Sequence, residues 1–356
     1  MNGKLKIKEI ALQTGLSNST VSRVLSGKAN SSDKARSKVL ACARQLGVLD
    51  ELADGRLLLN GVMIFAPARA FDARTDVFYY QVIQGILTAL RSYEVRVRYC
   101  ALEEYDSDAA LFMEKTRDPQ TEAVLMIGID DSYIHALAAD LGKPCVLINC
   151  RDRKMRLPSV APDHPAIGEA AAGYLHELGH HHILSLLCLR RYTMEHRLQG
   201  IKAAMKAHNL AFDEQRHLLP VAGFSAAESY QAVSEFLRGC PPEERPTALL
   251  AGGDFIAAGA AAALQDAGLR VPQDISLMSM DGFNSPLIHD IPLTALHVPR
   301  EELGEEAVRM LQRRVISPTQ PSGNLLLHGA LAVGKSVKRI RADHAHTPVN
   351  EEGLYD

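Results

Sequence analysis

Two stretches of the sequence carry residue types and spacings that enzymes use for chemistry. Residues 176–180, His-Glu-Leu-Gly-His, form the pattern in which two histidines on one helical face bind zinc and a glutamate acts as general base. Residues 329–336, Gly-Ala-Leu-Ala-Val-Gly-Lys-Ser, match the glycine-rich loop that binds nucleotide phosphates. Each chemistry also requires a particular local structure, so the elements around the two stretches decide whether either can operate.

The surroundings of the first stretch argue against a zinc hydrolase. Its two histidines would have to lie on one continuous helix. Gly179 stands where a C-terminal helix cap belongs, and the apolar run that follows is typical of a strand. Ile183 and Leu186 occupy the glycine and third histidine positions of the extended zinc motif. We therefore expect His180 to lie off the helix that carries His176, and we predict no metal site.

The surroundings of the second stretch argue against nucleotide binding. A phosphate-binding loop joins a strand to a helix whose amino terminus faces the phosphates. Residues 324–336 instead form one apolar stretch that predicts a single long strand, and residues 337–356 are polar without helical periodicity. We expect residues 337–356 to form a disordered polar tail, and we predict neither an enzyme nor a cofactor.

The composition and the amino terminus predict a cytoplasmic protein. No apolar run approaches the roughly 18 residues that span a bilayer. The charged start of the chain has no apolar signal core. The six cysteines include no C-x-x-C pair, so we expect reduced, mostly buried thiols and no disulfide framework.

Charge is divided unevenly along the chain. Residues 1–49 contain six lysines and three arginines against Glu9 and Asp33, which gives a net charge of +7. Because the whole chain carries −3, the remaining residues carry −10. A small basic segment on an acidic body is expected of a protein that holds a polyanion at one end, although a solvated basic surface would give the same charge.

Residues 1–49 also predict three short helices, each with its apolar residues on one face. Gly15 ends the first helix, Ser17 is a natural N-cap for the second, and Gly27 stops it. A third helix is predicted from about Ser32 to Leu46, with Gly47 at its end. Three short helices with a tight turn between the first two form a helix-turn-helix.

In a helix-turn-helix, the amino-terminal end of the second helix enters the major groove of DNA. The residues predicted to meet base edges there are Asn18, Ser19 and Arg23. Asparagine can pair with adenine, and arginine with guanine, through two hydrogen bonds each. The residues predicted to contact phosphate, which fixes register without reading sequence, are Thr20, Ser22 and Lys34. A protein-docking module of three small helices is the alternative interpretation.

From residue 61 onward, short apolar runs alternate with amphipathic helical stretches. This alternation predicts an α/β fold, with parallel sheets flanked by helices and ligands bound beyond the carboxyl ends of the strands. A body of roughly 275 residues is large for one such sheet, so two lobes are expected. The predicted domains are a DNA-binding head at 1–49, a hinge at 50–60, a two-lobed core at 61–336 and a tail at 337–356.

The head resembles the DNA-binding domain of the lactose-repressor/galactose-repressor family of transcriptional regulators. Residues 20–23, Thr-Val-Ser-Arg, match the central motif of that domain, and further matches extend from Ile7 to Gly47. The body resembles the periplasmic-binding-protein-like core of the same family, most clearly over residues 246–298. The resemblance implies a repressor whose affinity for DNA is controlled by a small-molecule effector bound between two lobes.

The hinge departs from the family pattern. In the family, a tyrosine, a Pro-Asn pair and an Ala-Arg pair follow the head and build a hinge helix, whose leucine inserts into the minor groove. The residues at these positions are Val48, Asp50 and Glu51, and Asp54 and Gly55. Leu57 still falls at the position of the inserting leucine. Acidic residues facing phosphate are unfavourable, and a glycine inside a helix costs about 1 kcal/mol.

The same resemblance implies an effector site. The corresponding positions are Phe78, Tyr79, Asn149, Arg197, Gly253 and Asp281. An arginine with carboxylate and amide groups can bind neighbouring hydroxyls, and an aromatic face can cover a sugar ring. Gly253 replaces an asparagine of the family, and Arg190 and Arg191 add positive charge nearby, so a sugar or a sugar phosphate is the implied effector. Each of these residues could also serve only the fold.

These observations together predict a sequence-specific transcriptional regulator that acts on double-stranded DNA. We expect a homodimer, because two heads related by a two-fold axis read a pseudo-palindrome that one small head cannot. Residues 337–356 lack leucine heptads, so no tetramer is expected. The alternative, favoured by the irregular hinge, is a cytosolic small-molecule sensor that acts through a protein partner.

Overall fold

In the computed structural model, the described residues are 3–27, 32–53, 57–282, 287–288 and 291–340. The chain divides into two compact units, one of Met1–Pro162 with Pro299–Leu327 and one of Asp163–Val298 with His328–Asp356. We call residues 1–53 the head, the rest of the first unit the N-terminal lobe, and the second unit the C-terminal lobe. Because the chain passes between the units three times, each lobe combines segments that are distant in sequence.

The head contains the three predicted helices. They are α1 (Gly3–Thr14), α2 (Asn18–Leu25) and α3 (Asp33–Gln45). The Ser17 hydroxyl accepts a hydrogen bond from the backbone N–H of Thr20 at 3.1 Å, so the predicted cap of α2 is confirmed. Gly15 and Gly27 adopt positive φ angles of 68°, which lets the chain turn sharply after α1 and α2. The aliphatic core of the head includes Ile10, Val21, Val24, Leu25 and Val39.

The predicted hinge begins with a short helix, α4 (Leu49–Ala53), which contains Asp50 and Glu51. Glu51 forms an ion pair with Lys6 of α1, so this acidic residue serves a contact within the head. Asp54 and Gly55 lie outside the described residues. The chain then continues in three consecutive buried leucines, 57–59.

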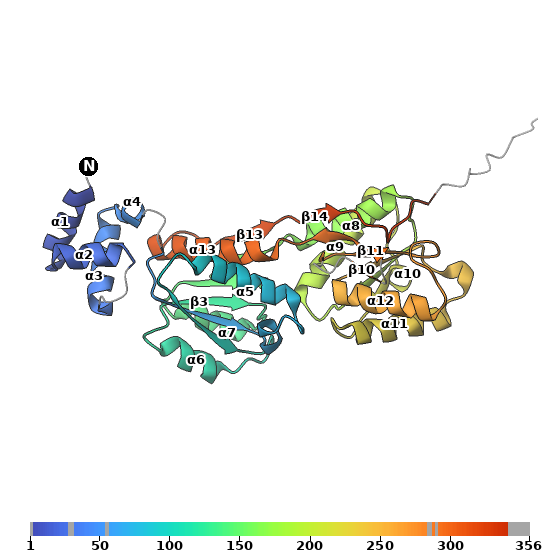
Figure 1. Cartoon of the computed structure of the whole chain (residues 1–356), viewed down its shortest axis with the longest axis horizontal. Helices are drawn as coiled ribbons and strands as arrows, with labels where there is room; N and C mark the ends of the chain where they lie inside the picture. Colours follow the sequence, from blue (N-terminus) through green and yellow to red (C-terminus); the bar gives the residue numbers. More distant parts are fainter. Residues whose placement is uncertain (1–2, 28–31, 54–56, 283–286, 289–290, 341–356) are drawn as a thin grey trace, which may run out of the picture. The chain divides into compact units, whose positions relative to one another are not determined.

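The N-terminal lobe is built on a six-stranded sheet in which all pairs are parallel, in the order β13-β5-β4-β3-β1-β2. Its strands are β1 (Gly61–Ala66), β2 (Arg96–Ala101), β3 (Ala123–Ile127), β4 (Cys145–Ile148), β5 (Ser159–Pro162) and β13 (Asn324–Leu327). Its helices are η1 (Ala68–Phe71), α5 (Val77–Leu90), α6 (Ala109–Arg117), α7 (Ser132–Asp140) and α13 (Arg300–Ile316). Helices α5 and α13 cover one face of the sheet, and α6 and α7 cover the other (Figure 1).

Helices α5 and α13 of this lobe pack with their backbones in close approach. A Cβ built on Gly85 of α5 would lie 1.9 Å from the carbonyl oxygen of Glu301. A Cβ built on Gly304 of α13 would lie 2.2 Å from the carbonyl oxygen of Val82. Because neither backbone oxygen can rotate out of the way, only glycine fits at these two positions.

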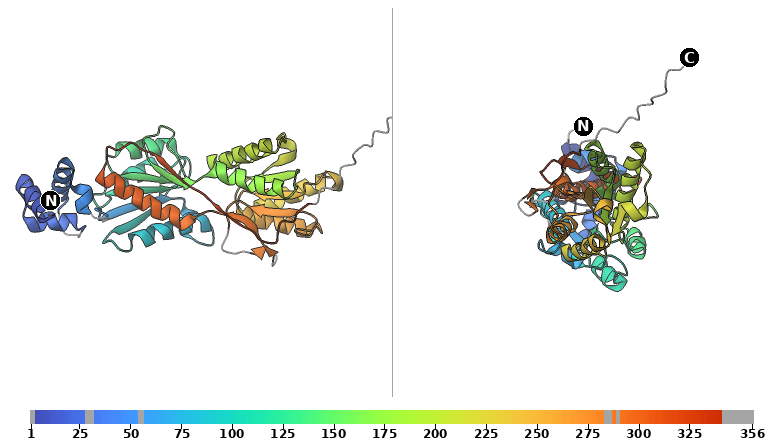
Figure 2. Two further views of the ribbon diagram at one scale, coloured as in Figure 1. Left: turned by 90° about the horizontal axis from the view of Figure 1, so that it is seen from above. Right: turned by 90° about the vertical axis from the view of Figure 1, so that its right-hand side faces the viewer.

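The C-terminal lobe holds a second six-stranded sheet, in the order β14-β12-β9-β8-β6-β7, with β14 antiparallel to β12 and the other pairs parallel. Its strands are β6 (Ile183–Leu187), β7 (Leu218–Pro220), β8 (Ala248–Ala251), β9 (Ser276–Ser279), β12 (Thr294–His297) and β14 (Ala330–Ala332). Its helices are α8 (His164–Glu177), α9 (Tyr192–Ala207), α10 (Glu214–His217), α11 (Ala226–Gly239) and α12 (Asp254–Asp266). Figure 2 shows the pair α8 and α9 on one side of this lobe and the pair α11 and α12 on the other. A short hairpin, β10 (Leu287–Ile288) and β11 (Ile291–Pro292), and a turn, η2 (Pro242–Glu244), complete the described elements.

The prediction of one long strand over residues 324–336 is wrong. The structure divides this stretch into β13, which pairs with β5 of the N-terminal lobe, and β14, which pairs with β12 of the C-terminal lobe. His328 and Gly329 separate the two strands, at the third passage of the chain between the units. The apolar pattern is the same on both sides of this break, so it does not reveal the change of sheet.

The start of the predicted polar tail belongs to the C-terminal lobe. The backbone N–H of Lys338 donates to the Ser276 hydroxyl at 3.1 Å, and that of Ile340 donates to the Leu178 carbonyl at 2.8 Å. The core therefore extends beyond residue 336, and residues 341–356 lie outside the described residues. In the part of the chain that the structure describes, no helix is long and apolar enough to cross a membrane.

Candidate functional sites

Helix α2 presents a polar face at the surface of the head. Asn18, Ser19, Ser22 and Arg23 are exposed, and Thr20 is half-buried. The Thr20 hydroxyl lies 2.9 Å from the hydroxyl of Ser17, so it belongs to the cap as well as to the surface. On the opposite side of α2, three aliphatic side chains are buried in the head. This division anchors α2 by its apolar side and leaves its amino-terminal polar side free to meet a ligand.

The residues predicted to contact phosphate lie on α2 and at the start of α3. Ser22 is exposed on α2, and Lys34 is exposed in the first turn of α3. The Ser32 hydroxyl caps α3 by accepting the backbone N–H of Ala35 at 3.3 Å. A helix amino terminus carries partial positive charge, and a lysine beside it adds a full charge, so this corner of the head favours an anion.

Leu57, predicted to insert into the minor groove, is buried. Its exposed fraction is 2%, and Leu58 and Leu59 beside it are buried as well. Its carbonyl oxygen lies 3.3 Å from the position that a Cβ on Gly27 would occupy, next to the end of α2. Insertion into DNA therefore requires Leu57 to leave this packing, and its role in DNA binding stays a prediction.

Arg197 organises the candidate effector residues of the C-terminal lobe. It lies on α9 with an exposed fraction of 1%. One terminal nitrogen, Nη1, donates to the Gly252 carbonyl at 2.6 Å, and the other, Nη2, donates to Asp281 Oδ1 at 2.7 Å. Nε donates to His164 Nδ1 at 3.2 Å. Gly252 follows β8 and Asp281 follows β9, so the cluster sits at the carboxyl ends of the strands, as predicted.

Gly253 lies against the same carboxylate. It is the N-cap residue of α12, in an extended backbone conformation. A Cβ built on it would lie 2.8 Å from Asp281 Oδ2. A side chain at this position, such as the asparagine that the family resemblance places there, would require the Asp281 carboxylate to shift.

His164, which the sequence did not single out, is held neutral by its surroundings. It is the first residue of α8 and is buried. Burial, followed by the positive charges of Arg197 and Arg191, lowers the pKa of His164 well below its ordinary value. A neutral imidazole can accept a hydrogen bond, which fits its role as acceptor for Nε of Arg197.

Ser279 and Asp254 add a second pair of polar groups at the same strand ends. The Ser279 hydroxyl, at the end of β9, donates to Asp254 Oδ1 at the start of α12. The backbone N–H of Asp281 donates to the Ser279 hydroxyl at 3.3 Å. A search for polar residues at the ends of predicted strands would have found Ser279.

The N-terminal lobe holds the other three predicted effector residues. Asn149, directly after β4, donates its side-chain N–H to the Tyr79 hydroxyl at 3.2 Å. Both side chains are buried, and Asn149 adopts a positive φ of 53°. The half-buried ring of Phe78 lies edge-on to that of Tyr79, with 5.3 Å between ring centroids. The structure thus groups Phe78, Tyr79 and Asn149 in one lobe, and Arg197, Gly253 and Asp281 in the other.

The histidine-rich stretch has no zinc-site geometry. Helix α8 ends at Glu177, so His180 lies off the helix that carries His176, as predicted. Nδ1 of His176 is 2.7 Å from the His180 carbonyl oxygen, and burial lowers the pKa of both imidazoles. Among the described residues, no three His, Cys, Asp or Glu side chains gather in a way that could hold a metal ion.

Two segments match known protein families. Residues 6–48 match the bacterial regulatory proteins of the lacI family, and residues 172–337 match a periplasmic binding protein-like domain. The chain therefore joins a helix-turn-helix domain of the lacI family to a periplasmic binding protein-like domain. The first match covers α2, α3 and most of α1, so this helix-turn-helix is the DNA-binding domain of the chain.

Two proteins with similar sequences are transcriptional repressors. The HTH-type transcriptional repressor PurR of Klebsiella pneumoniae (strain 342) is 27% identical over 336 residues, which cover 93% of this chain and 96% of PurR. The HTH-type transcriptional repressor CytR of Escherichia coli (strain K12) is 26% identical over 341 residues, which cover 94% of this chain and 96% of CytR.

Solved structures of transcriptional regulators share the fold of this chain. The lac repressor dimer bound to operator and an anti-inducer matches with a TM-score of 0.67 at 21% identity, covering 92% of this chain and 98% of that chain. A regulator of the family from Enterococcus faecium, with bound ribose, matches with a TM-score of 0.67 at 21% identity, covering 79% of this chain and all of that one. The complex of the regulator CelR with cellobiose matches with a TM-score of 0.65 at 21% identity, over 93% and 99% of the two chains.

Proposed function

We propose that this protein is a sequence-specific repressor whose affinity for operator DNA is controlled by a small-molecule effector. The observation that carries the proposal is the amino-terminal face of α2. Ser17 caps the helix, and Asn18 and Ser19 stand exposed beside the cap, where a helix-turn-helix meets base edges. Arg23 is exposed in the last turn of the same helix. The repressors PurR and CytR, similar over nearly the whole chain, support the direction of regulation.

The effector is a polyhydroxylated small molecule, a sugar or a sugar derivative. Asp281, with its side chain 22% exposed, offers carboxylate oxygens to neighbouring hydroxyls, and Arg197 fixes its orientation. On the N-terminal lobe, Phe78 offers a half-buried aromatic face of the kind that covers a sugar ring. The sugars bound to the similar structures, ribose and cellobiose, belong to this chemical class.

The regulator acts as a homodimer on a pseudo-palindromic operator. One head presents only a few side chains to base edges, which cannot specify a genomic site alone. A two-fold axis doubles the number of base pairs that are read. The operator complex of the similar lac repressor is that of a dimer.

The deciding experiment is selection of duplexes from a random DNA pool with the full-length protein. We expect a palindromic consensus to emerge, with affinity that falls steeply as salt rises. Arg23→Ala should cost about 1–3 kcal/mol and relax preference at one base of each half-site. Lys34→Ala, the matched control, should weaken all sequences equally and lower the salt slope by about one. If no preferred sequence emerges, the head does not read DNA, and a sensor that acts through a protein partner becomes the better account.

The effector is sought by repeating the binding measurement on the selected duplex with a panel of sugars and sugar phosphates. A sugar that is an effector must change operator affinity, because effector and DNA binding are coupled reciprocally. Asp281→Asn, which keeps the shape of the side chain and removes its charge, should abolish that response while operator affinity without the sugar is unchanged. A variant that still responds fully would contradict the assignment of Asp281 to the effector site.

A further inference from the structure

Helix α3 of the head is attached to the N-terminal lobe by two arginines. Nη1 of Arg36 lies 3.3 Å and 3.2 Å from the two carboxylate oxygens of Glu122, and the Arg36 side chain is buried. Arg44, two helical turns further on, donates from Nη2 to the Val315 carbonyl at 2.5 Å. Its Nε donates to the carbonyls of Val315 and Ile316 at 3.2 Å and 3.3 Å. Both arginines therefore bond to the N-terminal lobe, whereas the polar residues of α2 are exposed at the surface.

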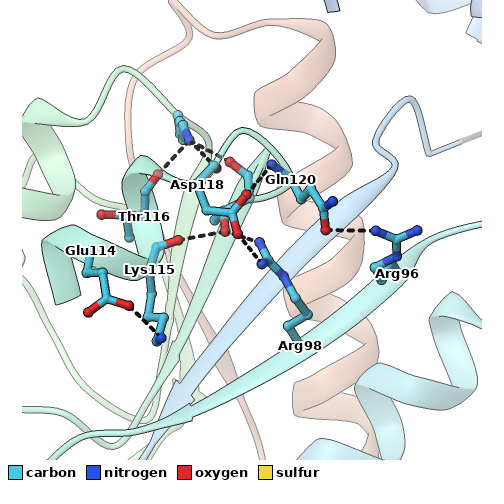
Figure 3. Close-up of polar contacts among 9 residues, drawn as sticks. Arg96, Arg98, Glu114, Lys115, Thr116, Asp118 and Gln120 are labelled. Atoms are coloured by element: carbon cyan, nitrogen blue, oxygen red, sulfur yellow. Dashed lines mark hydrogen bonds and ion pairs between the residues drawn. The ribbon is translucent and has the colours of Figure 1, made fainter. Parts of the chain in front are cut away.

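The Glu122 attachment point is rigid. Glu122 stands just before β3, and its Oε2 also accepts the backbone N–H of Asn60 at 3.2 Å. The preceding loop is tied to β2 by hydrogen bonds from Arg98 to Asp118 and from Arg96 to Gln120 (Figure 3). The ammonium group of Lys143 adds two bonds of 2.6 Å, to the carbonyls of Thr116 and Thr121. This point ties the head to the start of β3.

The Arg44 attachment point is the carboxyl end of α13. The last carbonyls of a helix have no partner within the helix and carry partial negative charge, so a guanidinium there is held by both hydrogen bonds and charge. Helix α13 has 17 residues and is therefore about 25 Å long. Arg44 thus fastens the head to one end of a long rigid element of the N-terminal lobe.

The other end of α13 reaches the candidate effector residues. Arg300, the first residue of α13, has its guanidinium carbon 5.7 Å from the ring centroid of Phe78 and donates to Gln81 at 3.0 Å. Phe78 and Gln81 both lie in the first turns of α5. Gly85 and Gly304 bring the backbones of α5 and α13 into contact near the start of α13, so a shift of α5 there is expected to carry α13 with it.

We propose that Arg44 is the residue that couples the DNA-binding head to the effector site, through its hold on the carboxyl end of α13. A change at Phe78 moves α5 and α13 as one body, and Arg44 transmits the displacement to α3. Because coupling is reciprocal, DNA binding at the head should also change the environment of the residues at the start of α5. This inference rests on the proposed function, because it assumes that the head binds DNA.

The test uses the absence of tryptophan from the sequence. Tyr80→Trp, in the first turns of α5 and not among the candidate effector residues, introduces a single fluorophore. Acrylamide quenching of this tryptophan is measured in the full-length protein, with and without a saturating amount of the selected duplex. We expect DNA to change the quenching constant, Arg44→Gln to abolish that change, and Arg44→Lys to restore part of it. Lys38→Gln, which removes an exposed charge from the same helix, should behave like the parent.

Two controls separate coupling from other roles of Arg44. Circular dichroism and thermal unfolding establish that each variant is folded. If Arg44→Gln does not fold, Arg44→Lys still provides a variant that keeps a cation at the end of α13. The salt dependence of DNA binding should be the same for Arg44→Gln and the parent, whereas loss of a phosphate contact would lower the slope by about one.

The outcomes distinguish this inference from the proposed function. If no duplex is selected, the proposed function fails and the inference fails with it. If the duplex binds but the tryptophan does not respond, or if the response survives in Arg44→Gln, DNA binding stands and the coupling role of Arg44 is overturned. A reduced salt slope in Arg44→Gln would identify Arg44 as a phosphate ligand and would equally overturn the inference.

Discussion

Replacing Gly304 by alanine should destabilise the joint between α13 and α5. The added Cβ would lie 2.2 Å from the Val82 carbonyl oxygen and 2.6 Å from the Ile86 backbone nitrogen. A non-bonded contact of a carbon atom is comfortable at about 3.5 Å, so the two helices would have to separate by about 1 Å. Overpacking of this kind costs about 1–3 kcal/mol. The obstructing atoms belong to the backbone, so we expect an overpacking cost at the upper end of that range. The better helix propensity of alanine offsets about 1 kcal/mol of this loss in the free energy of unfolding.

The matched control is Gly173→Ala, inside helix α8. A Cβ there meets no atom within 4 Å, so the same substitution gains helix propensity without a clash. We expect it to stabilise the protein by about 0.5–1 kcal/mol, the opposite sign to Gly304→Ala. Urea unfolding followed by circular dichroism measures both variants against the parent. A Gly304→Ala protein with an unchanged or raised unfolding midpoint would show that α5 and α13 are not locked together.

Three further substitutions test the head and the Arg197 cluster. Ser17→Ala removes the cap of α2 and should lower the stability of the head by about 1 kcal/mol. Operator binding in a gel-shift titration should weaken as a result. Unchanged binding would show that the cap does not support the DNA-binding surface. Arg197→Met removes one donor from Asp281 and one from His164, and it should cost about 3 kcal/mol in urea unfolding. A variant as stable as the parent would contradict the observed bonds. Because the pKa of His164 is depressed in the folded state, the unfolded chain binds its proton first, and stability is lost as pH falls below about 6.5. The unfolding midpoint should fall less steeply with acidification in His164→Gln, and parallel pH profiles would contradict a neutral buried imidazole.

The head could be predicted from the sequence because its determinants are local. Ser17 caps α2 through an atom three residues away, and Gly15 and Gly27 form the turns on either side. The alternation of strands and helices could also be predicted from the sequence, because each short apolar run indicates a buried strand by itself. What these patterns do not contain is the partner of each strand.

The division of residues 324–336 between two sheets shows where sequence reasoning stops. Both β13 and β14 are apolar and short, and only the pairing of Asn324 with Ser159 and of Ala330 with His297 assigns them to different lobes. These partners are separated from them by 165 residues in one case and 33 in the other. Burial and strand propensity are the same for either assignment, so no local pattern could have separated them.

The candidate sites divide in the same way. The family resemblance indicated Asn149, Arg197 and Asp281 in advance, and the structure places Asn149 and Asp281 just after strands β4 and β9. His164 could not be indicated in advance, because its role depends on the 3.2 Å approach of Arg197 from another helix. The attachment of Arg44 to α13 was equally invisible, since it joins residues separated by about 270 positions.

The surroundings of Arg197 bear on its predicted contact with an effector. The family resemblance implies an arginine that binds the effector directly. In the structure, Nε and both terminal nitrogens of Arg197 donate to protein acceptors, and the side chain is 1% exposed. These three bonds stabilise the geometry around Arg197, because they tie the ends of β8 and β9 to α8 and align the Asp281 carboxylate. We therefore expect Asp281 to offer its carboxylate to an effector in this lobe, and Arg197 to determine where that carboxylate stands.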